Sequence, residues 1–94
     1  MTAKRYAAQI VFTQADEHRW VGKLLNPNAI DTHYGTKAGR IRCVIEEGDT
    51  GRCDMMVQGG HVGGRRYSTH DNLTEAQEAA IRWAGRRFKI VVEK

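Results

Sequence analysis

Residues 70–88 read HDNLTEAQEAAIRWAGRRF and carry the clearest secondary-structure pattern of the chain. Thr74 followed by Gln77 has the spacing of a capping box, with Leu73 as the apolar residue before it. Small alanines along one face would let this segment approach a sheet closely. We therefore predict one helix over about 74–88, with Trp83 and Phe88 supplying most of its buried surface. Its apolar side chains recur at helical spacing: Ala76, Ala79, Ala80, Trp83, Ala84 and Phe88.

Apolar and polar side chains alternate in the segments before this helix, which is the period of a half-buried strand. Residues 5–13 and 19–25 alternate on either side of a polar turn and predict a hairpin. Residues 41–58 predict a second hairpin around the turn EGDTG, and residues 65–69 predict a short strand that follows it. Residues 89–94, KIVVEK, predict a final extended segment.

This order of elements predicts a small two-layer α+β domain. A mainly antiparallel sheet of four to five strands, packed on one C-terminal helix, would bury every apolar row. The 94 residues fit a single domain spanning 1–94. Residues 26–39 show no sustained period and predict a long loop. We expect it to be a connector, with a functional loop as the alternative.

The segment VQGGHVGGRRYSTH, residues 57–70, holds four glycines, two histidines and an arginine pair. A phosphate-binding loop runs from a strand through glycines directly into a helix, and ends in lysine followed by Ser or Thr. Here a strand pattern follows the glycines instead. We therefore expect a tight turn, with contact to an anionic partner as the second reading.

Two cysteines and two histidines are spaced C-x9-C-x7-H-x8-H, at Cys43, Cys53, His61 and His70. Zinc sites usually contain a closely spaced ligand pair, which this pattern lacks. Both cysteines fall in the apolar rows of their strands, so we expect buried thiols. Catalytic motifs are not found either. We predict no catalytic residue, no metal and no cofactor.

The chain is basic, with fifteen Lys and Arg against eleven Asp and Glu, a net charge of +4. Ten of the fifteen cations are arginine, which suits two-pronged contacts to phosphate or carboxylate. A membrane span and a signal-peptide pattern are not found, so we expect a cytoplasmic protein with reduced cysteines.

These cations are the candidate binding residues for nucleic acid or an acidic partner. The competing reading is a solvated surface with internal ion pairs. We predict a small non-catalytic basic binding module with a protein or nucleic-acid partner, and an enzyme only as a distant third. Strand edges could also form a homodimer. The candidates are Arg40, Arg42, Arg52, Arg65, Arg66, Arg82, Arg86, Arg87 and Lys89.

The segment STHDNLTEAQEAAIRWA, residues 68–84, resembles the end of HicB-type antitoxin domains, where a strand leads through a polar turn into an alanine-rich helix. The hairpin at 6–25 is similar to that pattern too. The resemblance covers less than half of the chain, and the loop at 26–39 and the hairpin at 41–57 depart from it. It implies a bacterial or phage-like antitoxin or inhibitor that acts by binding a macromolecular target.

Overall fold

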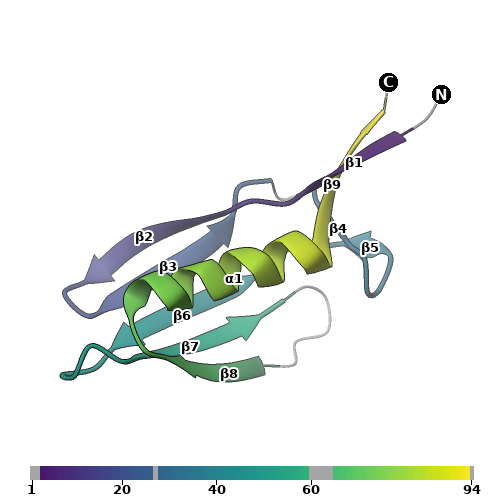
Figure 1. Ribbon diagram of the computed structural model, residues 1–94. Helices are drawn as coiled ribbons and strands as arrows, with labels where there is room; N and C mark the ends of the chain where they lie inside the picture. Colours follow the sequence, from purple (N-terminus) through teal and green to yellow (C-terminus); the bar gives the residue numbers. More distant parts are fainter. Residues whose placement is uncertain (1–2, 27, 60–64, 94) are drawn as a thin grey trace.

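The computed structural model describes residues 3–26, 28–59 and 65–93 and has an α+β architecture with one helix and two antiparallel sheets (Figure 1). The elements are β1 (Ala3–Ala7), β2 (Ile10–Asp16), β3 (Arg19–Leu24), β4 (Ile30–Asp31), β5 (Thr36–Lys37), β6 (Arg42–Glu47), β7 (Cys53–Gln58), β8 (Arg65–His70), α1 (Leu73–Arg87) and β9 (Phe88–Glu93).

The larger sheet has five strands in the order β2-β3-β6-β7-β8, and all neighbours are antiparallel. Both predicted hairpins are confirmed, as is the short strand that becomes β8. In the second hairpin Cys43 lies opposite Val57 and Cys53 lies opposite Glu47. The two cysteines are therefore not cross-strand neighbours.

A second sheet, in the order β1-β9-β4-β5, was not foreseen. The predicted single strand at 5–13 is divided at Ala8 and Gln9, and its two halves, β1 and β2, join different sheets. The prediction that 26–39 is a plain connector is wrong, because this segment contains β4 and β5. Ile30 in β4 pairs with Lys89 in β9.

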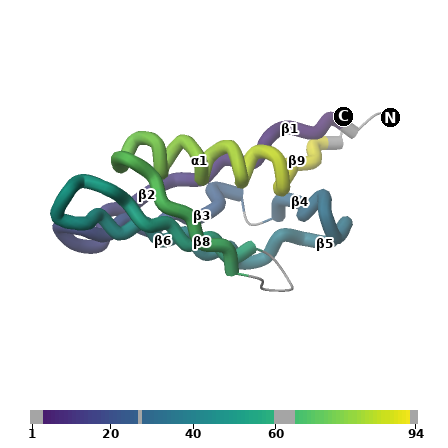
Figure 2. Tube along the Cα trace, turned by 60° about the horizontal axis from the view of Figure 1, so that its bottom comes forward, coloured from purple at the N-terminus to yellow at the C-terminus, as the bar shows by residue number. Residues whose placement is uncertain are grey.

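Helix α1 extends across the five-stranded sheet and contacts β2, β6, β7 and β8 (Figures 1 and 2). Ala76, Ala80 and Ala84 are fully buried, so the predicted small-residue face is confirmed. The predicted capping box is wrong. The N-cap is Asn72, whose side-chain oxygen accepts from the backbone N–H of Glu75 at 2.9 Å, and the helix begins at Leu73.

The core cluster brings together buried side chains of α1, β2, β6 and β7, with further members from the segments around β4 and β5. Cys43 and Cys53 are fully buried, which confirms the placement predicted for them. Among the described residues Phe88 is the largest fully buried side chain, and Trp83, which is partly buried, packs against the core as well. Their rings meet edge to face at 5.4 Å. Gly59 lies against both, since a Cβ there would come within 2.9 Å of Trp83 and 3.0 Å of Phe88.

Within the described residues, no helix is long and apolar enough to span a bilayer.

Candidate anion-binding site

Four of the nine predicted binding cations gather around one surface hollow of about 670 Å³. Arg65 and Arg66 reach it from the start of β8, and Arg86 and Arg87 from the end of α1. Ala79 and Trp83 of α1 add to the helix side of the hollow, and the remaining wall comes from the turn between β4 and β5. We call this hollow the arginine pocket; its lining residues are Thr32, His33, Tyr34, Arg65, Arg66, Ala79, Trp83, Arg86 and Arg87.

One of these arginines is held inside the protein. The Nε of Arg87 donates to Oδ2 of Asp31 at 3.3 Å, with Oδ1 at 3.5 Å. Asp31 is 1% exposed, and the Arg87 side chain is 20% exposed. A buried carboxylate requires a charge partner and hydrogen bonds. We therefore assign Arg87 mainly a structural role, as the charge partner of Asp31. The same guanidinium lies 5.6 Å from the ring centre of Tyr34, within reach of a cation–π contact.

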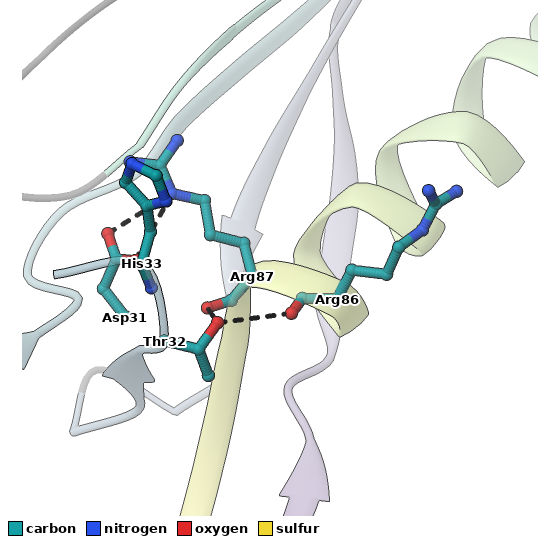
Figure 3. A network of polar contacts seen from close by, with 5 residues as sticks. All are labelled: Asp31, Thr32, His33, Arg86 and Arg87. Carbon is teal, nitrogen blue, oxygen red and sulfur yellow. Dashed lines mark hydrogen bonds and ion pairs between the residues drawn. The ribbon is translucent and has the colours of Figure 1, made fainter. Parts of the chain in front are cut away.

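The turn after β4 also closes the end of the helix (Figure 3). The Thr32 hydroxyl donates to the carbonyl oxygen of Arg87 at 2.8 Å, and the Thr32 backbone N–H donates to the same oxygen. Asp31 completes the turn by accepting from the backbone N–H of His33 at 2.9 Å. The last carbonyls of a helix lack partners within the helix, so these bonds fix the β4–β5 turn against α1.

Arg86 differs from its neighbour. Figure 3 shows the Arg87 side chain extending towards Asp31, whereas the Arg86 side chain extends away from this network. Arg65, Arg66 and Arg86 are all exposed. Among the described residues, none of these three forms an ion pair with a carboxylate. Three guanidinium groups at the arginine pocket are therefore available to an anion from solution.

Aromatic side chains lie beside these cations. Tyr34 is 45% exposed, and its ring meets that of His33 edge to face at 4.7 Å. Trp83 presents part of its indole to the pocket from α1. The pocket thus offers positive charge for an anionic group and ring faces for a flat apolar one.

The other five predicted cations lie elsewhere. Arg42 lies on the sheet face opposite α1, and Arg40 borders a separate hollow beside β3. Arg52 is exposed beside the β6–β7 turn, and Arg82 is exposed on the helix. Lys89 donates to the carbonyl oxygen of Gly85 and so caps the helix. The nine cations therefore do not form one continuous surface.

The cysteines are placed for packing. Burial raises the pKa of the Cys43 thiol to about 12, and it also raises the pKa of Cys53, with smaller contributions from Glu47 and Asp54. Both side chains are thus held as neutral thiols, which are poor nucleophiles and poor metal ligands. Within 3–26, 28–59 and 65–93, no group of three metal-ligating side chains comes together. His61 and most of the GGHVGG segment lie outside these residues.

Ala79 and Trp83 were predicted only as part of the apolar helix face, and four further contributors to the pocket were missed by sequence reasoning: Asp31, Thr32, His33 and Tyr34. These four all belong to the segment taken for a connector. A usable signal was present, because Asp31 and Thr32 precede a histidine–tyrosine–glycine turn in a loop too long for a simple connection. Comparisons of the chain with protein-family models, with curated proteins and with solved structures found no match.

Proposed function

We propose that this protein is a non-catalytic binding module whose arginine pocket holds a segment of single-stranded nucleic acid. The observation that carries the proposal is the gathering of Arg65, Arg66 and Arg86 beside two aromatic rings. Phosphate groups would be bound by the guanidinium groups, whose forked N–H donors match phosphate oxygens. An unpaired base would lie on the exposed part of Tyr34 or Trp83.

Single strands suit this pocket better than duplexes do. A base can stack on a protein ring only when its own face is free, and duplex DNA keeps these faces covered. Tyr34 meets the ring of His33 edge to face and lies near the Arg87 guanidinium, so its ring is ordered before any ligand arrives. Such preorganisation lowers the entropic cost of binding.

An acidic protein segment is the competing ligand. It would use the same guanidinium groups through carboxylates, yet it would not need the two rings beside them. The aromatic side chains therefore favour nucleic acid as the ligand, whereas the positive charge of the pocket suits nucleic acid and an acidic protein segment equally.

The test is fluorescence anisotropy with labelled oligothymidylate, single-stranded RNA and a DNA duplex at two salt concentrations. Three phosphate contacts predict that log K falls by about 2 per log unit of salt on a single strand. Replacing Arg66 and Arg86 together by alanine should reduce this slope by about 1.4 and weaken binding at least tenfold. Tyr34→Leu should weaken binding to single strands while leaving the salt slope unchanged.

The matched control removes the same charge elsewhere. Arg52→Ala with Arg82→Ala takes away two exposed arginines that do not line the pocket. The proposal requires this variant to keep the wild-type slope. Equal losses in the two double variants would assign the binding to net charge alone. Undetectable binding at about 50 mM salt, where phosphate contacts are strongest, would refute the proposal.

A further inference from the structure

The sheet face opposite α1 carries a row of apolar side chains that crosses four strands. Backbone register places Val21 opposite Val44, Val44 opposite Met56, and Met56 opposite Tyr67. Their neighbours along the strands, such as Cys43 and Val57, point into the core below the helix. Tyr67 is 72% exposed, although it lies in the middle of a strand. We call these four residues the apolar row.

A row of cations flanks the apolar row on one side. Arg42 lies opposite Gln58, and Gln58 lies opposite Arg65, two positions along each strand from the apolar row. Lys23 continues this row onto β3, since it follows Val21 by two residues and lies opposite Val11. The basic row therefore holds three positive charges.

The other flank is richer in carboxylates. Arg19 lies opposite Glu46, Glu46 lies opposite Asp54, and Asp54 lies opposite Thr69. The Nη2 of Arg19 and Oε1 of Glu46 form an exposed ion pair at 2.9 Å. Two carboxylates against one cation leave this acidic row with a net negative charge.

These rows select one way for two copies to meet. In aligned face-to-face packing, the strands of two sheets stay within about 30° of each other, so a two-fold axis in such an interface runs either along the strands or along the apolar row. A two-fold axis along the strands would place the basic row of one copy on the basic row of the other. An axis along the apolar row places the basic row of each copy on the acidic row of the other, with Arg42 over Glu46 in both halves.

We propose that this sheet face is the interface of a homodimer whose two-fold axis follows the apolar row. Each apolar side chain then meets its own counterpart near the axis, as a self-complementary interface requires. The face measures roughly 20 by 20 Å, from five strands about 4.8 Å apart and six residues about 3.4 Å long. This area is at the low end for specific association, so the dimer forms at high protein concentration.

The experiment is sedimentation equilibrium of the full chain, without nucleic acid, from about 10 to 500 µM, the range in which small interfaces associate. Wild-type protein should show a monomer–dimer equilibrium. Arg42→Glu places the new carboxylate over Glu46 of the other copy, and this happens at both symmetry-related positions of the dimer. The change should weaken association roughly tenfold or more. Combining Arg42→Glu with Glu46→Arg exchanges the charges in both halves and should restore association to within about threefold of wild type.

Arg82→Glu is the control, because it makes the same charge change on the helix, away from this face. Thermal unfolding of each variant separates a loss of association from a loss of folding. A wild-type chain that stays monomeric throughout the range overturns the proposal. It is equally overturned if Arg82→Glu weakens association as much as Arg42→Glu does, or if the double exchange fails to recover it. Arg65 belongs to both surfaces, but the experiment contains no nucleic acid, and the exchanged residues Arg42 and Glu46 do not line the arginine pocket, so the two proposals fail independently.

Discussion

Asp31 and Arg87 lie 56 positions apart in the chain, yet the carboxylate of one is within 3.3 Å of the Nε of the other. The pair joins β4 to the end of α1 at the edge of the arginine pocket. It explains why two adjacent arginines have different roles, with Arg87 directed inward and Arg86 directed to solvent.

Replacing Arg87 by alanine should therefore destabilise the protein, while replacing Arg86 should not. The first change leaves the Asp31 carboxylate buried without its charge partner, at a cost of about 3 kcal/mol. The second removes an exposed side chain and should change stability by less than about 0.5 kcal/mol. Urea unfolding of the two variants measures the difference. Equal stability would mean that the ion pair does not anchor the β4–β5 turn.

The start of the helix gives a second pair of matched variants. Asn72→Ala removes the oxygen that accepts from the Glu75 N–H and should cost about 1 kcal/mol. Thr74→Ala, at the position that the sequence favoured as the cap, should be neutral or slightly stabilising, because alanine is the better helix former. Thermal unfolding midpoints would show the order. A larger loss for Thr74→Ala would place the cap where the sequence pattern had it.

We expect the stability of the core to fall more when Phe88 is replaced by alanine than when Trp83 is. Phe88 is fully buried where the helix passes into β9, so Phe88→Ala should cost about 3–5 kcal/mol. Trp83→Ala should cost less, since part of its indole is at the pocket surface. Denaturant unfolding of both variants tests the ranking. The opposite order would indicate that the indole contributes most of the packing after all.

Burial of the Cys43 thiol should make the free energy of unfolding depend on pH in the alkaline range. The pKa of this thiol is near 9.0 in an unfolded chain and about 12 in the folded protein. Between these values the unfolded chain releases the proton and the folded protein keeps it, so stability falls as pH rises from 9 to 12. The slope from this group is at most about 1.4 kcal/mol per pH unit. Under reducing conditions Cys43→Ala should show a shallower decline above pH 9, and an unchanged decline would contradict the burial effect.

The parts of the fold that sequence reasoning predicted are those with a local period. Both hairpins alternate every second residue, and the helix repeats every three or four, so their existence follows from short windows. The break between β1 and β2 produces no change in the local sequence period. Tyr6, Ala8, Ile10 and Phe12 alternate without interruption across it, because the chain changes strand partners while keeping its side-chain alternation.

The candidate site was predictable only in part, for a similar reason. Arg65 and Arg66 were grouped together, although neighbours on a strand alternate between faces. Arg66 lies opposite Val57, on the helix side, whereas Arg65 lies at the strand end and borders both the arginine pocket and the opposite sheet face. Which cations gather depends on β8 lying at a sheet edge beside α1. This arrangement is a property of the tertiary structure, and counting charges along the sequence cannot predict it. The same holds for Asp31, whose partner is remote in sequence.

The pairing of β1 with β9 has a consequence for the order of folding. It joins Ala3 to Glu93 and Ala7 to Lys89, the most widely separated partners in the described chain. The entropy of closing so long a loop is recovered only after nearer contacts have formed. The hairpins and α1 can assemble from residues 10–88, so β1 is expected to dock last. In the native protein its amide hydrogens should then exchange with solvent deuterium before those of β6 and β7, through local opening that leaves the core intact.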